Sequence, residues 1–105
     1  MIFSDELLKT LEADGMQWTR EDDGTLTYVS CYEHSMATVF PEKETFTITN
    51  EARDPSEKGI ICERTFADCK SPEDLLKDVA GAAEAFDYGI EQAMTSICPY
   101  DTVED

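Results

Sequence analysis

The only histidine, His34, stands beside a potential nucleophile in the segment Tyr32-Glu33-His34-Ser35. Histidine is the usual general base near neutral pH, so it could activate a serine hydroxyl or a cysteine thiol. Ser35 is poorly suited to this role, because two adjacent side chains seldom point at one another, and no segment resembles an oxyanion-hole loop. The sequence therefore favours a protein that is not an enzyme, with His34 in a surface turn between two strands.

Carboxylates and thiols provide possible metal ligands. Glu21-Asp22-Asp23-Gly24 has oxygen ligands for a hard cation but lacks the alternating ligand spacing of a calcium loop, so it is predicted to be a turn. The four cysteines lack the close pairs typical of zinc sites and redox motifs: Cys31, Cys62, Cys69 and Cys98. We expect reduced thiols, no metal and no cofactor. Two disulfides, or one zinc ion bound by distant thiols, are the alternatives.

A row of carboxylates on one predicted helix indicates binding through charge. Glu84, Asp87 and Glu91 are separated by about 4.5 and 6 Å along a helix axis. Neighbouring phosphates on one strand of duplex DNA are about 3.4 Å apart along the axis, so such a row could occupy a basic groove built for nucleic acid. The expected partner-binding residues lie on this helix and at a hairpin tip: Glu73, Asp74, Asp78, Glu84, Asp87, Tyr88, Glu91, Glu21, Asp22 and Asp23.

Simpler interpretations exist for the same residues. Any amphipathic helix has a charged face in contact with water, and the acids could serve solubility alone. Against this, surface helices usually alternate charge signs to form ion pairs, whereas Lys77 is the only base between Ser71 and Ile97. Tyr88 lies on the acidic side, where its ring could stack on an arginine of a partner or simply pack at the helix margin.

The helix that carries this row is predicted from Ser71 to Ile97. Ser71 is a good N-cap, Pro72 suits the first helical position, and Cys98-Pro99 ends the helix. Ten residues fall within one apolar arc at about 100° per residue, as a half-buried helix requires: Leu75, Leu76, Val79, Ala82, Ala83, Phe86, Ile90, Ala93, Met94 and Ile97.

The rest of the chain reads as one helix and a set of short strands. A helix is expected from Ser4 to Asp14, ended by Gly15. Alternating and β-branched segments predict two hairpins and a fifth strand, over residues 16–20 and 25–32, 36–40 and 44–50, and 60–66. In the segment over residues 44–50, Phe46 and Ile48 should face the core. Thr45, Thr47 and Thr49, which alternate with them, should face water. The fold class is therefore α+β: an N-terminal helix, a four- to five-stranded antiparallel meander, and a long C-terminal helix packed on one face.

Length and charge limit the possible functions. The 105 residues suit a single globular domain, residues 1–105, with a frayed acidic tail over 99–105. Eight bases and 24 acids give a net charge of −16, which disfavours direct binding to nucleic acid or to an anionic membrane. The start of the chain lacks the basic and apolar regions of a secretory signal, so we expect a cytoplasmic protein of unknown oligomeric state.

These features favour a non-enzymatic acidic inhibitor that covers the basic nucleic-acid-binding surface of a partner, such as a CRISPR effector or a restriction enzyme. In size, charge and expected architecture the chain is similar to small acidic inhibitors of phages and mobile elements, including anti-CRISPR and anti-restriction proteins, although no motif links it to one family. An immunity protein for a basic toxin nuclease or an acidic secretion chaperone is the first alternative. A small enzyme is the second.

Overall fold

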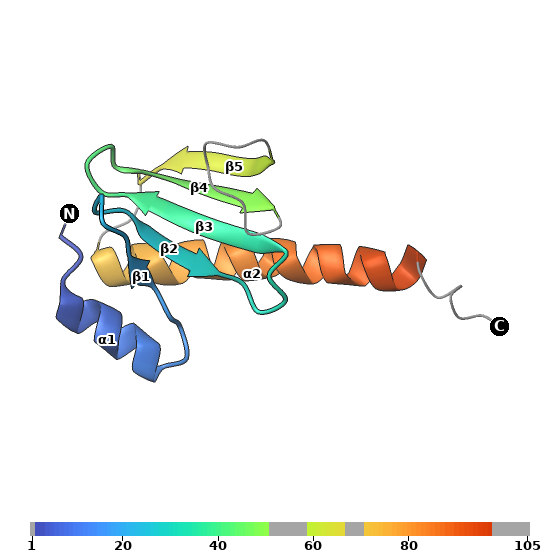
Figure 1. Cartoon of the computed structure of the whole chain (residues 1–105), viewed down its shortest axis with the longest axis horizontal. Coiled ribbons are helices and arrows are strands. Elements are labelled where there is room, and N and C mark those ends of the chain that lie inside the picture. Colours follow the sequence, from blue (N-terminus) through green and yellow to red (C-terminus); the bar gives the residue numbers. More distant parts are fainter. Residues whose placement is uncertain (1, 51–58, 67–70, 98–105) are drawn as a thin grey trace.

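The computed structural model describes residues 2–50, 59–66 and 71–97, with the side chains of residues 94–97 left out of the description. Its elements follow in the order α1 (Asp5–Ala13), β1 (Thr19–Arg20), β2 (Leu26–Val29), β3 (Ser35–Phe40), β4 (Thr45–Asn50), β5 (Ile60–Thr65) and α2 (Pro72–Ile97). The strands form one antiparallel sheet in the order β1-β2-β3-β4-β5. The predicted α+β class and the meander are confirmed (Figure 1).

The two helix starts follow the sequence prediction closely. The Ser4 hydroxyl accepts a hydrogen bond from the Leu7 amide at 3.1 Å, and the Ser71 hydroxyl accepts one from the Asp74 amide, also at 3.1 Å. Gly15 follows α1 with a φ of 90°, a left-handed conformation that costs glycine little. Local capping chemistry therefore sets both helix starts and the end of α1.

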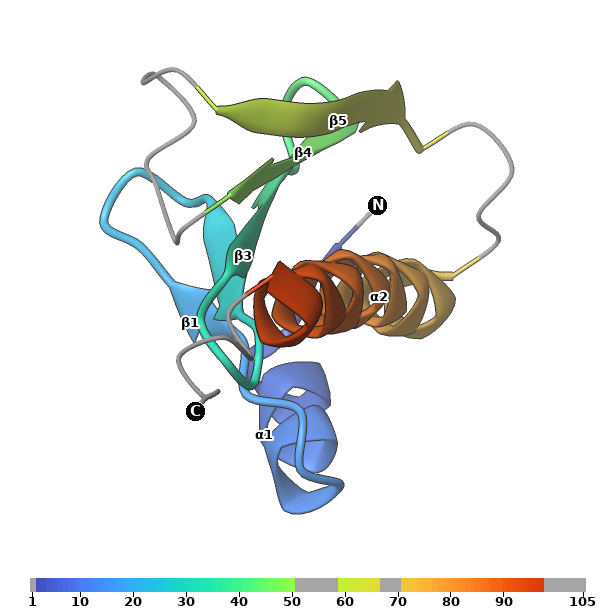
Figure 2. The same cartoon turned by 90° about the vertical axis from the view of Figure 1, so that its right-hand side faces the viewer.

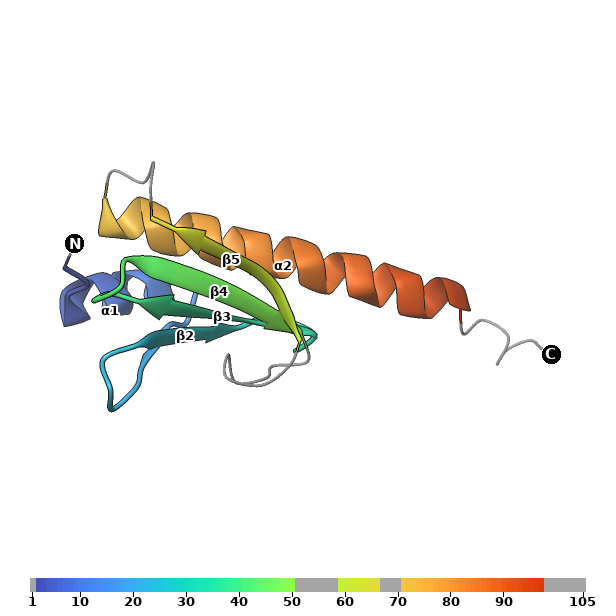
Figure 3. The same ribbon diagram turned by 90° about the horizontal axis from the view of Figure 1, so that it is seen from above.

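The core lies between α2 and the sheet, which curves around the helix (Figure 2). Ala37, Val39 and Ile48 project from the inner face of the central strands, and fully buried apolar residues of α2 meet them: Leu75, Leu76, Val79, Ala80 and Ala83. The shorter helix α1 packs beside the first half of α2 and contributes Leu11 to the core. Figure 3 shows that α2 runs along the sheet and continues beyond its end.

The outer face of the sheet departs from the predicted alternation of buried and wet residues. Ile48 is buried and Phe46 is half-buried, as expected, but Thr47 and Thr49 on the opposite face are only 3% and 0% exposed. The prediction that these two threonines face water is wrong. A short side chain in a central strand has neighbours from two strands on the same face, and larger ones shield it.

Several boundaries differ from the sequence prediction. The strand predicted over residues 16–20 is reduced to the two residues of β1, and the one predicted over 25–32 ends at Val29. The tail over residues 99–105 lies outside the described residues. None of the helices in the described part of the chain has the length and apolar character needed to cross a membrane.

Candidate partner-binding surfaces

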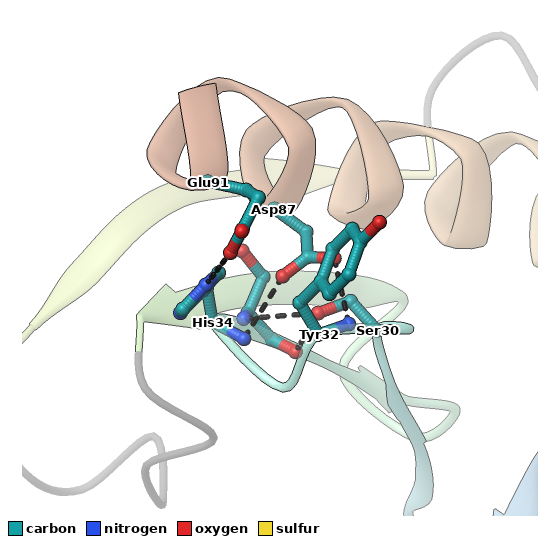
Figure 4. A network of polar contacts seen from close by, with 6 residues as sticks. Ser30, Tyr32, His34, Asp87 and Glu91 are labelled. Atoms are coloured by element: carbon teal, nitrogen blue, oxygen red, sulfur yellow. Dashed lines mark hydrogen bonds and ion pairs between the residues drawn. The ribbon is translucent and has the colours of Figure 1, made fainter. Parts of the chain in front are cut away.

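Asp87 points into the protein and not toward solvent. It is 1% exposed, and its two carboxylate oxygens accept hydrogen bonds from the backbone amides of Tyr32 and His34, each at 2.9 Å (Figure 4). Both amides belong to the turn between β2 and β3. Hydrogen bonds from backbone N–H groups to a carboxylate are charge-assisted, and here they compensate for burying the charge.

Glu84, one helical turn earlier, binds the other end of the same turn. Its two oxygens accept from the Cys31 amide, each at 3.2 Å, and one of them also accepts from the Tyr28 hydroxyl at 2.6 Å. Burial raises the pKa of the Tyr28 hydroxyl, and the hydrogen bond to Glu84 raises it further. Tyr28 therefore stays neutral at ordinary pH and donates to the carboxylate.

Glu91 is the third acid of α2 that contacts the turn between β2 and β3, and it does so at the side chain of His34. The two are linked by a contact of 2.8 Å between Nε2 of the ring and the glutamate oxygen, which is an ion pair whenever the ring is protonated. The ring of Tyr32 lies against that of His34, with centroids 6.3 Å apart. His34 thus lies in a turn between two strands, as predicted, and contacts α2.

The turn also closes on itself. The Ser30 hydroxyl donates to the Ser35 carbonyl at 2.9 Å and accepts from the Ser35 amide at 3.0 Å, while the Glu33 amide donates to the Ser30 carbonyl. Every amide from Cys31 to Ser35 therefore has an acceptor, and three of these five amides bond to carboxylates of α2. We call Glu84, Asp87 and Glu91 the turn anchor.

The predicted acidic row is therefore not a free outer face of the helix. The prediction that Asp87 faces solvent is wrong, and so is the prediction that Phe86 is buried, because Phe86 is 39% exposed. The buried stripe of α2 runs through Ala83 to Asp87, since this half of the helix meets the polar turn and not the apolar sheet. The side chains of Met94 and Ile97, also predicted in the arc, lie outside the described residues.

The first turns of α2 retain the exposed acids that were predicted there. Glu73, Asp74 and Asp78 are exposed, and Glu73 pairs with Lys77 at 2.8 Å. The hydrogen bond to Glu73 raises the pKa of Lys77, and the charges of Asp14 and Asp74 act in the same direction. Asp14, at the end of α1, is near enough for its charge to act on Lys77. We call Asp14, Glu73, Asp74 and Asp78 the helix patch.

Asp14 was missed in the sequence prediction. Nothing in the sequence shows that a charge at the end of α1 acts on the first turns of α2. Tyr88 is 62% exposed, so its ring is free to meet a partner. It lies 10 residues after Asp78, the last member of the helix patch, roughly 15 Å further along the helix at 1.5 Å per residue, and therefore outside the helix patch.

The predicted hairpin acids form a separate surface. Glu21, Asp22 and Asp23 are exposed at the turn between β1 and β2, which stands away from α2 (Figure 2). Asp23 accepts from the amide and hydroxyl of Thr25 at 3.0 and 2.7 Å, and these bonds lower its pKa. The structure thus divides the ten predicted residues among the turn anchor, the helix patch, the hairpin tip and Tyr88.

Two of the four cysteines lie within the described residues. Cys31 and Cys62 are free thiols, whereas Cys69 and Cys98 lie outside the described residues. Within residues 2–50, 59–66 and 71–93, no three His, Cys, Asp or Glu side chains are grouped so that they could hold a metal ion.

Comparison with known proteins adds no relative to this picture. No protein family, curated protein or solved structure is significantly similar to the chain. Function is therefore inferred from the surfaces described above.

Proposed function

We propose that the protein is an acidic, non-enzymatic inhibitor that binds the basic nucleic-acid-binding surface of a partner protein. The observation that supports this is the helix patch: the exposed carboxylates of Glu73, Asp74 and Asp78 on α2, together with the nearby Asp14 of α1. Lys77 is the base among them, and it is paired with Glu73. A surface of this kind is complementary to Lys- and Arg-rich grooves.

The mechanism would be competition for the groove. Carboxylates of the helix patch would take the positions of phosphates, and the net charge of −16 would speed association with a basic partner. A CRISPR effector or a restriction enzyme would then lose access to DNA. Binding of this type weakens as salt concentration rises, because the charges are exposed and screened.

An immunity protein for a basic toxin nuclease would use the same electrostatics. It differs from the leading proposal in the partner, which would be one toxin and not a DNA-binding defence protein. The identity of the captured protein therefore distinguishes the two.

The experiment is capture from bacterial lysate on the immobilised protein at about 0.1 and 0.5 M salt, with and without competing duplex DNA. We expect a DNA-binding protein, identified by mass spectrometry, that is retained at low salt and released by high salt or DNA. Capture of no protein, or of one indifferent to both salt and DNA, would contradict the proposal.

A further inference from the structure

The outer face of the sheet, opposite α2, contains a groove of about 980 Å³. Strands β2, β3 and β4 form its floor, and the β1–β2 hairpin and β5 form its two sides. α2 covers the inner face of the same sheet, as Figure 2 shows. No residue of the helix patch or of the turn anchor lines the groove.

A row of threonines crosses the middle of the floor. Thr27, Thr38 and Thr47 are direct cross-strand neighbours on β2, β3 and β4, so their side chains share one face. Thr38 and Thr47 are each 3% exposed, and the hydroxyl of each lacks a hydrogen-bond partner in the described structure. Both hydroxyl oxygens are shielded from solvent, so the row shapes the floor of the groove and offers no polar contact to a ligand.

The floor is apolar on one side of this row. Val29, Met36 and Ile60 lie there, and Val29 and Ile60 are 45% and 46% exposed. On the other side, the ring of Phe40 lies under Lys43, whose ammonium is 5.3 Å from the ring centroid. Exposed aliphatic side chains along a groove suit a ligand with an apolar face.

The rim of the groove is acidic on both sides. Glu21, Asp22 and Asp23 line it at the hairpin, and Glu63 lines it on β5. Lys43 is the base among the lining residues, so the acids outnumber it. Glu21 and Asp23 are held in place by hydrogen bonds to Thr27 and Thr25. The rim therefore attracts positive charge toward an apolar floor.

We propose that this groove binds a basic amphipathic helix of a partner protein. The apolar side of that helix would cover Val29, Met36 and Ile60, and its Lys or Arg side chains would meet the acidic rim. Strands β2 to β4 span about 10 Å at the usual strand spacing, which matches the diameter of a helix. That the partner is basic rests on the proposed function. The surface assigned to it here is the groove, which is different from the helix patch.

The test uses the full chain and a synthetic amphipathic peptide of Lys and Leu, with a scrambled peptide of the same composition as control. Fluorescence anisotropy should show the amphipathic peptide binding at least about tenfold more tightly than the scrambled one. Val29→Asp with Ile60→Asp should remove that preference, and both positions are exposed enough for the fold to tolerate the change. Equal affinity for the two peptides would overturn the proposal.

A measurement on the unmodified protein locates the binding site. Amide chemical shifts on adding the peptide should move at Thr27, Thr38 and Thr47 and remain unchanged at Glu73 and Asp78. Shifts confined to the helix patch, or a peptide that binds in an extended form by circular dichroism, would also overturn the proposal. If the groove fails this test while DNA-sensitive capture persists, only the present inference is lost; if capture fails while the peptide binds, only the proposed function is lost.

Discussion

At the residue scale, the main finding is that carboxylates of similar appearance have different roles. Asp87 is bonded to two turn amides and buried, whereas Asp78 is exposed on the same helix. The sequence predicts both as surface acids, because at about 100° per residue position 87 lies roughly 20° outside the edge of the apolar arc and its side chain is charged. What reverses this is the turn from Cys31 to His34, whose amides need acceptors, and that contact is between residues more than 50 positions apart.

Replacing Asp87 with alanine tests this distinction. Asp87→Ala leaves two turn amides without acceptors, and we expect a loss of about 2 kcal/mol in the free energy of unfolding. This corresponds to a fall of roughly 10 °C in Tm for a domain of this size. Asp78→Ala is the matched control and should change stability by less than about 0.5 kcal/mol. Equal Tm values for the two variants, measured by circular dichroism, would refute the role given to Asp87.

At the element scale, local signals predicted the helices well and the strands less well. Ser4, Ser71 and Gly15 set helix ends through their own hydrogen bonds or conformation, so the sequence sufficed. β1 is shorter than predicted. In the second half of α2 a different side of the helix is buried from the one predicted, with Asp87 inside and Phe86 exposed. Both depend on contacts made by distant parts of the chain. The alternation in residues 45–49 predicts which face of the sheet Thr47 is on, but neither its burial nor its cross-strand neighbours Thr27 and Thr38 could be predicted from it.

The burial of Tyr28 on β2 and its hydrogen bond to Glu84 on α2 should make the free energy of unfolding depend on pH. The pKa of Tyr28 is raised in the folded protein, so its contribution to stability is complete below about pH 10, the usual pKa of tyrosine, and is lost as pH rises above that value. Tyr28→Phe should therefore show a smaller fall in Tm between about pH 9 and 11 than the unmodified protein. Tyr88→Phe removes an exposed hydroxyl and is the matched control for the substitution itself. A Tyr28→Phe variant with the unmodified pH dependence would show that the contact with Glu84 has no such effect.

At the scale of the whole molecule, the acids form separate surfaces on a small α+β domain. The helix patch consists of acids on the first turns of α2 and of Asp14 at the end of α1, and the hairpin acids border the groove on the other side of the sheet. A net charge of −16 costs stability through self-repulsion. The acids of the turn anchor offset part of that cost by binding amides and His34, whereas those of the helix patch remain available to a partner.

Because the acids are divided between the turn anchor and the helix patch, only reversal of the helix patch tests partner binding. Reversing Glu84, Asp87 and Glu91 would disrupt the turn anchor and report on stability. The helix patch can instead be reversed by Glu73→Lys, Asp74→Lys and Asp78→Lys. A matched control, Glu33→Lys, Glu42→Lys and Glu44→Lys, makes the same change in net charge at exposed positions elsewhere.

The most direct measurement compares DNA-sensitive capture of a basic protein by these two variants and the unmodified chain, after Tm values have shown that all three are folded. We expect reversal of the helix patch to abolish capture and the control to retain most of it. Equal loss in both variants would mean that net charge alone attracts the partner, and retention in both would exclude the helix patch as the binding surface.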